Sequence, residues 1–225
     1  MIDWTEGYVS DIEYTAGVYK ELAPNFLDVC ALIHGYLPPK RESFNYLELG
    51  CGRGIGSVIQ AAANPQGHFY AVDFNPSHIH EAKRLVQKAG LENIQCIEAS
   101  FEEIAHGKID LPECQYIVFH GIYTWVNKEN REYLRQITRE YLASGGLAFN
   151  SYNCMPGWAA PGPLQRLLRD WSRQYSGKST DRLQKAIESI KGFVETNPKF
   201  FQANSGLKER LEKLINQNPN YLVHE

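Results

Sequence analysis

The sequence lacks the long apolar runs that mark membrane-spanning and secreted proteins. None of its apolar stretches approaches the roughly 18 residues that a membrane-spanning helix needs. The opening residues, MIDWTE, provide neither a basic start nor an apolar core, so this pattern predicts no secretory signal. We therefore expect a cytoplasmic protein without a membrane span.

Excess positive charge and a patterned set of metal ligands are missing as well. The 23 Lys and Arg residues are outnumbered by 26 Asp and Glu residues, which argues against a protein built around nucleic-acid phosphates. The 5 cysteines are an odd number without metal spacing, which favours free thiols in a reducing compartment. Because the 7 histidines are scattered, the sequence predicts no metal site. The balance of charges predicts no nucleic-acid partner.

The most informative stretch is a glycine-rich turn at residues 45–56. An apolar run there ends at Glu48, and glycine then takes every second position, at Gly50, Gly52 and Gly54. Glycine tolerates positive φ and lets a ligand approach the backbone, and the start of the following helix offers free N–H groups. The expected occupant is a nucleotide-like ligand; the alternative is a glycine-rich turn that binds nothing.

The spacing of the glycines argues against a dinucleotide. The dinucleotide fingerprint is Gly-x-Gly-x-x-Gly. Counted from Gly50 its third glycine falls on Ile55, and counted from Gly52 it falls on Ser57. Both frames fail, so an NAD-type oxidoreductase is a disfavoured reading.

A second motif follows at residues 68–76. It predicts a strand that ends at Asp73, 19 residues after Gly54. An acid near this distance accepts the ribose hydroxyls of a bound nucleotide in such folds, and Phe74 is then expected to lie against the base. The alternative role for Asp73 is a helix cap, but Asn75 is better placed to cap a helix that starts at Ser77.

The remaining pattern alternates strands and helices and predicts an α/β fold. We expect a Rossmann-like, doubly wound parallel sheet in the order 3-2-1-4-5, with the ligand at the carboxyl ends of the strands. The helix predicted at 127–142 is expected to be separated from the fifth strand by Gly145 and Gly146. The predicted strands are 45–49, 68–72, 94–98, 116–119 and 147–152, and the predicted helices between them are 55–63, 77–89 and 127–142.

Three regions are expected along the chain. Residues 1–44 form an N-terminal segment with a helix, beside the cofactor pocket, and residues 45–159 form the Rossmann-like core. Residues 160–225 form a helical insertion or lid, in which no pair of strands is predicted. The tyrosines of the first segment are expected to line the pocket or to pack on the core; they are Tyr8, Tyr14 and Tyr19.

The acid-x-Gly-x-Gly-x-Gly pattern from Glu48 to Gly54 resembles the first motif of class I S-adenosylmethionine (SAM) methyltransferases. Stretches 7–14, 120–125, 151–158 and 218–225 are similar to one bacterial subfamily that carries a C-terminal methyltransferase regulatory domain. That subfamily includes lysine methyltransferases of outer-membrane proteins. The resemblance implies SAM as the cofactor and S-adenosylhomocysteine as the product. It also implies that a final antiparallel strand pair and a second domain follow a segment like 218–225.

The resemblance also implies which residues contact the cofactor. The glycine turn passes under the methionine part of SAM, and Glu48 helps to orient that end. The adenine is read after the third strand, where Glu98, Ser100 and the N–H of Phe101 are the candidates, although the usual Asp-small pair is absent. The full set of expected cofactor contacts is Glu48, Gly50, Cys51, Gly52, Gly54, Asp73, Phe74, Ser100, Phe101 and His120.

The methyl acceptor is expected beside the loops that follow strands four and five. His120 is a candidate general base, and the alternative is a histidine hydrogen-bonded to the backbone. Aromatic rings there suit a lysine ammonium or a planar ligand, and the alternative is a packing role. The expected catalytic residues are His120, Trp125 and Tyr152, and the expected acceptor contacts are Tyr14, Tyr123, Trp125, Tyr152, Asn153 and Trp158.

The sequence therefore predicts a SAM-dependent methyltransferase whose acceptor the residues do not name. A protein lysine amine is one candidate acceptor. Two alternatives stay open: a small-molecule N- or O-methyltransferase, and a module that binds SAM without catalysis.

Overall fold

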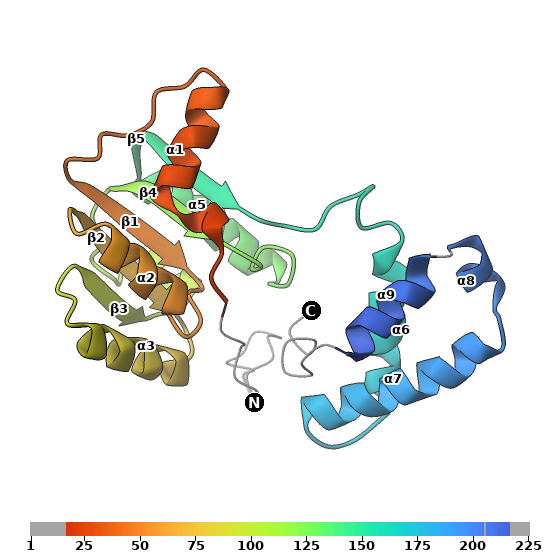
Figure 1. Cartoon of the computed structure of the whole chain (residues 1–225). Coiled ribbons are helices and arrows are strands. Elements are labelled where there is room, and N and C mark those ends of the chain that lie inside the picture. The colour runs from red at the N-terminus through yellow and green to blue at the C-terminus, as the bar shows by residue number, and fades with distance from the viewer. Residues whose placement is uncertain (1–16, 205, 217–225) are drawn as a thin grey trace. The chain divides into compact units, whose positions relative to one another are not determined.

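The computed structural model describes residues 17–204 and 206–216, shown in Figure 1. Of these residues, those up to Tyr152 form one compact unit, and those from Asn153 onward form another. The first unit carries the sheet and the second is helical.

A five-stranded parallel sheet forms the centre of the first unit. The strand order is β3-β2-β1-β4-β5, as predicted, and every neighbouring pair is parallel. The three central strands, β1, β2 and β4, are mostly buried, as expected for parallel strands covered on both faces, whereas the edge strands β3 and β5 are more exposed. The strands are β1 (Phe44–Leu49), β2 (Gly67–Asp73), β3 (Ile94–Glu98), β4 (Cys114–Phe119) and β5 (Leu142–Asn150).

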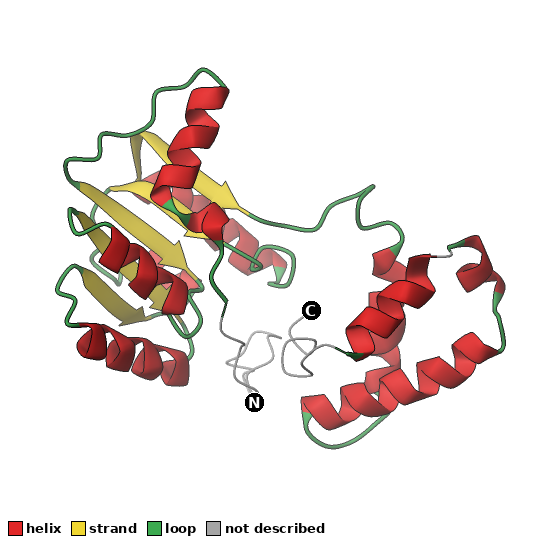
Figure 2. Ribbon diagram, viewed as in Figure 1, coloured by secondary structure: helices red, strands yellow, loops and turns green. Residues whose placement is uncertain are grey.

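Helices cover both faces of the sheet, as Figures 1 and 2 show. Because successive side chains of a strand point to opposite faces, Tyr46 packs with α1 and α2, whereas Leu47 packs with α4 and α5. A smaller core joins α3 to β2 and β3. The bounds are η1 (Lys20–Leu22), α1 (Pro24–Ile33), α2 (Ile55–Ala63), α3 (Pro76–Ala89), α4 (Phe101–Ala105) and α5 (Lys128–Tyr141).

The fifth strand differs from its prediction. It begins at Leu142, directly after α5, so Gly145 and Gly146 lie inside the strand and do not separate it from the helix. The pairing of β4 with β5 shifts register between Cys114 and Tyr116, and Gly145 has a φ of 77°. The two glycines therefore accommodate an irregularity in a continuous strand, which is a common use of glycine at bulges.

The described part of the helical unit consists of four helices, in the region that was predicted to be helical. Its core is built from the buried side chains Leu164, Ile190, Phe201, Leu207 and Leu211. No strand occurs among its described residues, 153–204 and 206–216. None of the helices in the described ranges combines the length and apolar character required to cross a membrane. The helices are α6 (Pro161–Ser172), α7 (Ser179–Glu195), α8 (Lys199–Ala203) and α9 (Gly206–Ile215).

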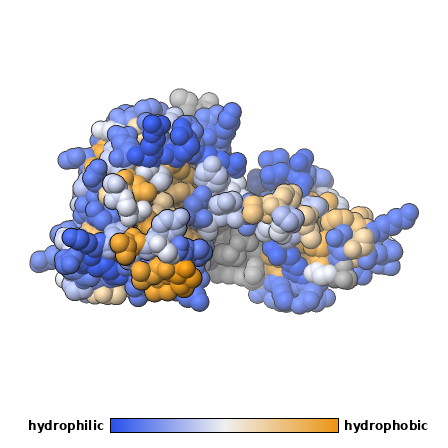
Figure 3. All heavy atoms as spheres, turned by 90° about the horizontal axis from the view of Figure 1, so that it is seen from above, coloured by the Kyte–Doolittle hydropathy of each residue, from blue (hydrophilic) through white to orange (hydrophobic). Residues whose placement is uncertain are grey.

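A buried polar contact fastens α1 to the sheet. The Tyr116 hydroxyl donates to the Asp28 carboxylate over 2.7 Å, and Arg41 donates to the same carboxylate over 3.3 Å. The other face of α1 remains at the surface, where Ile33 is 76% exposed, and Leu37, in the segment after the helix, is 89% exposed. Figure 3 shows apolar residues, in orange, exposed among hydrophilic ones on the face in view. The contact with Asp28 therefore holds α1 against the sheet.

The first residue of β2 provides a test of the packing on this face. A Cβ atom on Gly67 would lie 2.5 Å from the Phe44 ring and 2.9 Å from the Phe69 ring, and both rings are fully buried. We expect Gly67→Ala to lower the free energy of unfolding by about 1–3 kcal/mol, as overpacking does. Urea denaturation of the parent and the variant measures this change in the free energy of unfolding.

Gly56 provides the matched control. It lies in α2, and the nearest atom to an added Cβ is 3.9 Å away. Gly56→Ala should therefore raise the free energy of unfolding by up to about 1 kcal/mol. Equal effects of the two substitutions would contradict the packing described here.

Candidate active site

The glycine turn connects β1 to α2 in a tight, left-handed path. Gly50, Gly52 and Gly54 have φ values of 73°, 54° and 72°, a region that residues with a Cβ rarely enter. The amides of Gly50 and Cys51 both donate to the Val72 carbonyl, over 2.8 and 2.9 Å. The turn is thereby fixed against the end of β2.

Two of the glycines are also required by their neighbours. A Cβ on Gly50 would lie 2.5 Å from the Ile122 side chain, and one on Gly54 would lie 2.6 Å from Ala82 in α3. The side chain of Arg53 pairs with Glu81 of α3. The turn therefore lies directly against α3 and the loop after β4, so its path is set by tertiary contacts as well as by glycine.

Asp73 organises the turn from the end of β2. Its side chain is buried, and its Oδ2 accepts the Gly52 amide hydrogen over 2.9 Å. Its Oδ1 accepts the Asn75 amide hydrogen over 2.9 Å and lies 3.1 Å from Nδ1 of His78. Asn75, as predicted, caps α3 by accepting from the Ser77 amide over 3.0 Å. Asp73 is therefore not the cap of that helix.

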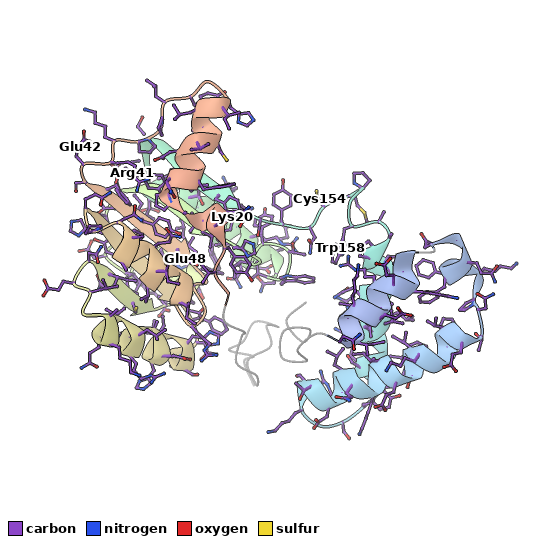
Figure 4. The ribbon with its side chains drawn as sticks, viewed as in Figure 1. Lys20, Arg41, Glu42, Glu48, Cys154 and Trp158 are labelled. Carbon is purple, nitrogen blue, oxygen red and sulfur yellow. The ribbon has the colours of Figure 1, made fainter. Side chains whose placement is uncertain are left out.

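Glu48 is the second-last residue of β1, beside the same turn, and is labelled in Figure 4. Its carboxylate is buried and accepts a hydrogen bond from the Ser57 hydroxyl. Burial raises the pKa of Glu48 to about 7; the Ser57 hydrogen bond lowers it, and the nearby charge of Asp73 raises it. Burial also raises the pKa of the neighbouring Cys51 thiol well above its usual value, so this thiol stays neutral.

The exit of β3 contains a motif that sequence reasoning missed. Ser100 and Glu103 form a capping box at the start of α4: the Glu103 amide donates to the Ser100 hydroxyl over 3.2 Å, and the Ser100 amide donates to the Glu103 carboxylate over 2.9 Å. The Ser-x-x-Glu spacing is a recognisable signal for this motif. The Ser100 hydroxyl is therefore engaged in the helix, and the Phe101 ring reaches within 4.0 Å of a Cβ built on Gly50.

His120 follows β4 and is held between two aromatic rings. Its ring stacks on Tyr19, with centroids 3.9 Å apart, and lies parallel to Phe149 at 6.4 Å. Burial lowers the pKa of His120, while the charge of Glu21 acts in the opposite direction. The imidazole is therefore uncharged at neutral pH, which leaves a ring nitrogen able to accept a proton.

The loops after β4 and β5 are fastened to each other. The Gly121 amide donates to the Ser151 hydroxyl over 2.8 Å, and the Ser151 amide donates to the Phe119 carbonyl over 3.3 Å. Beyond these bonds the rings of Tyr123 and Tyr152 lie 6.1 Å apart, and Tyr152 is 57% exposed. The structure thus brings together two of the predicted acceptor residues.

Arg131 of α5 supports this pair, and no sequence signal identified it. Its guanidinium donates to the Thr124 carbonyl over 3.0 Å and lies over the Tyr123 ring, 5.6 Å from the centroid. In the same loop the Trp125 amide donates to the Ile122 carbonyl over 2.9 Å. The loop after β4 is therefore held from α5 as well as from β5.

Three further predicted acceptor residues lie outside the described part of the sheet unit, and their role at the acceptor site stays a prediction. Asn153 and Trp158 are part of the helical unit, where Arg210 lies over the Trp158 ring, 5.4 Å from its centroid. Figure 4 labels Trp158. Tyr14 lies outside the described residues. In residues 17–204 and 206–216, His, Cys, Asp and Glu side chains form no group of three that could hold a metal ion.

A family model described as "Methyltransferase domain" matches residues 40–219. The chain belongs to this family. Together with the five-stranded fold, this match makes the chain a class I SAM-dependent methyltransferase domain, whose cofactor is SAM.

Two curated relatives cover nearly the whole chain. The uncharacterized protein sll1526 of Synechocystis sp. is 42% identical over 223 residues, which are 99% of this chain and 44% of that protein. The uncharacterized protein RP789 of Rickettsia prowazekii is 30% identical over 96% of this chain and 38% of its own length. The chain thus spans less than half the length of these two relatives.

Two solved structures of PKMT2 from Rickettsia typhi share the fold. The one in complex with AdoHcy is 23% identical, with a TM-score of 0.77 over 94% of this chain and 40% of that chain. The other is 24% identical, with a TM-score of 0.75 over 94% of this chain and 39% of that chain. At this level of identity the likeness concerns the fold.

The residues at the turn suit the cofactor of this family. Gly50, Gly52 and Gly54 give the turn a positive-φ path that residues with a Cβ rarely adopt, and Ile122 and Ala82 pack where Cβ atoms would lie on Gly50 and Gly54. Asp73 adds a buried carboxylate whose Oδ2 accepts one amide hydrogen and retains capacity for a further donor. These two features match a ligand with a ribose that must approach the backbone closely.

The pKa of Glu48 predicts a dependence of stability on pH. The folded protein holds this proton up to about pH 7, against a usual pKa of 4.5 for glutamate. Between these values the folded state binds more protons than the unfolded state, so this group makes stability fall as pH rises. In the parent protein this group should lower the free energy of unfolding by about 3 kcal/mol between pH 4 and pH 8, and Glu48→Gln should remove that decrease. Urea denaturation across this range tests it, and parallel curves for parent and variant would be the contrary result.

Asp73 predicts an effect on the cofactor itself. Asp73→Ala should weaken the binding of S-adenosylhomocysteine by about 1–3 kcal/mol, because donors of the ligand and of the turn lose a charged acceptor. Isothermal titration calorimetry measures the change, and circular dichroism checks the fold. Unchanged affinity would remove Asp73 from the cofactor site.

Proposed function

We propose that this chain is the catalytic domain of a larger protein and that it methylates an amine, with a protein lysine side chain as the leading acceptor. The observation that carries the proposal is the exposed Tyr152 ring, 6.1 Å from Tyr123. Both rings follow strands whose carboxyl ends meet the cofactor edge of the sheet. A small-molecule amine or hydroxyl is the alternative acceptor.

Methyl transfer places few chemical demands on the protein. When bound, SAM supplies a methyl group activated by a positively charged sulfur. The protein has to position the acceptor in line with that methyl group and to exclude water. An attacking amine must also be uncharged, so it needs a place for its proton. The nitrogen lone pair then forms the new bond to carbon, and the electrons of the carbon–sulfur bond stay on sulfur.

The cofactor is proposed to lie along the exits of the first three strands. Asp73 accepts a ribose hydroxyl through Oδ2, and Glu48 orients the methionine end. Phe74 and the Phe101 amide flank the adenine. The turn geometry supports this arrangement, because glycine takes every second position of the turn and the Asp73 carboxylate accepts the Gly52 amide hydrogen directly beside it.

His120 is proposed to take the proton of the acceptor amine. Its lowered pKa keeps the imidazole uncharged at neutral pH, which a general base requires. The stacking on Tyr19 restrains the plane of the ring. The position at the end of β4, next to β1, supports this role because it faces the methyl end of a cofactor that lies over β1 and β2.

The aromatic rings are proposed to hold the acceptor cation before it loses its proton. Arg131 already occupies one face of Tyr123, which shows that this ring accommodates a positive charge. The more exposed Tyr152 ring is left for the acceptor. A cation over such a ring is stabilised by about 0.5–2 kcal/mol, depending on how far it is desolvated.

The length of the relatives supports placing this chain in the subfamily with a C-terminal regulatory domain. The chain matches 44% of sll1526 and 40% of a PKMT2 chain. In this proposal the remaining part of such a protein selects the acceptor, while the present chain binds the cofactor and carries out the transfer.

A transfer experiment tests the proposal directly. The protein is incubated with a cell extract and SAM that carries tritium on the transferable methyl group, and the labelled product is identified by mass spectrometry. We expect label in protein, as methylated lysine. Label found only in small molecules would support the alternative acceptor, and no label from a protein that binds SAM would indicate a non-catalytic module.

Substitutions in the aromatic loops separate cofactor binding from transfer. Trp125→Ala and Tyr152→Ala should each keep near-parent affinity for S-adenosylhomocysteine. They should lose at least about tenfold in kcat/KM, or roughly 1.4 kcal/mol of transition-state stabilisation, because in this proposal they touch the acceptor and not the cofactor. Tyr36→Ala is the control, since Tyr36 is 70% exposed after α1 and away from the site. Parent rates for both loop variants would make these aromatics packing residues.

A further inference from the structure

His78 is a buried histidine that the proposed reaction does not use. It lies in the first turn of α3, five residues after Asp73, and only 4% of its surface is exposed. Its Nδ1 lies 3.1 Å from Oδ1 of Asp73. Because a carboxylate oxygen can only accept, Nδ1 donates its hydrogen in this contact.

The second ring nitrogen of His78 has no hydrogen-bond partner among the described residues, although it is buried. Burying a polar atom without a partner lowers stability. An apolar side chain of similar size would fill this space without that penalty. Packing alone therefore does not account for a histidine here, and the contact with Asp73 is the feature that distinguishes it.

The hydrogen bonds of Asp73 show what this contact does. A carboxylate oxygen has two lone pairs. Oδ1 uses both, for the Asn75 amide and for His78, while Oδ2 uses one, for the Gly52 amide. The rotation of the carboxylate is thereby fixed from α3, and the remaining acceptor capacity is on Oδ2.

We propose that His78 is a positioning residue for the cofactor: it holds Oδ1 of Asp73, so that Oδ2 is presented to a ribose hydroxyl. The inference rests on the proposed ribose contact of Asp73. It assigns His78 no contact with the cofactor. It predicts that His78 affects recognition of the ribose specifically, beyond any effect on folding.

Two amide substitutions separate the two ring nitrogens. The side-chain amide of Asn occupies a position close to Nδ1 of histidine, and that of Gln reaches the position of Nε2. H78N therefore retains a donor toward Asp73, whereas H78Q does not. H80Q is the matched control, because His80 is exposed on the same helix.

The readout is discrimination between ribose analogues. Calorimetry compares S-adenosylhomocysteine with its 2′-deoxy and 3′-deoxy analogues, for the parent protein and each variant. For the parent, we expect at least one deoxy analogue to bind about tenfold more weakly, as loss of a hydrogen bond to a charged group implies. H78N and H80Q should keep this ratio, and H78Q should reduce it to less than about threefold, because the His78 hydrogen bond that helps to fix the carboxylate is lost.

Two results would overturn the inference, and they are distinguishable. If H78Q discriminates as the parent does, His78 is a packing residue and the ribose contact of Asp73 is unaffected. If the parent binds both deoxy analogues as tightly as S-adenosylhomocysteine, the proposed ribose contact fails, and the role of His78 fails with it. Circular dichroism and the denaturation midpoint confirm that each variant is folded. If H78Q does not fold, H78L takes its place, with the same expected loss of discrimination.

Discussion

The hydrogen bond from the Gly52 amide to the buried carboxylate of Asp73 fixes the part of the structure on which the other site residues depend. Removing a carboxylate from water is costly unless donors replace the lost hydration. Here Gly52, Asn75 and His78 supply those donors, from the turn and from α3. The same bonds hold the turn in a conformation that only glycine adopts easily, so the carboxylate and the glycines require each other.

A second acid makes this edge of the sheet suited to a cation. Glu48 and Asp73 are both buried at neighbouring strand ends, and the charge of Asp73 contributes to the raised pKa of Glu48. A ligand with a positive charge relieves such repulsion and favours the ionised carboxylate. SAM carries a charged sulfur and an ammonium group. The positive charges of the proposed cofactor therefore complement the two buried carboxyl groups, and this argument does not depend on the family match.

The proposed site residues are concentrated in one of the two compact units. The unit that ends at Tyr152 contains the glycine turn, Asp73, His120 and the Tyr123–Tyr152 pair, while the helical unit has a core of its own. The relatives sll1526 and RP789 are each more than twice as long as the segment that this chain matches. This arrangement agrees with a proposed division in which the sheet unit performs the transfer and other parts of a larger protein select the acceptor.

Local patterns in the sequence determined the strands, the glycine turn and the Asn75 cap, because hydrophobic period, turn chemistry and capping act between near neighbours. The strand order was predictable for a different reason, because crossovers between parallel strands have one handedness and the ligand site marks the switch point beside the first strand. The start of β5 escaped prediction, since two glycines usually end an element and here sit within a strand. Only the tertiary structure decided the stacking of Tyr19 on His120 and the placing of Arg131 over Tyr123. The first of these contacts joins residues about a hundred positions apart, and neither carries a local signal. Both depend on which faces of the sheet and helices pack together, which is settled by burial of the whole core.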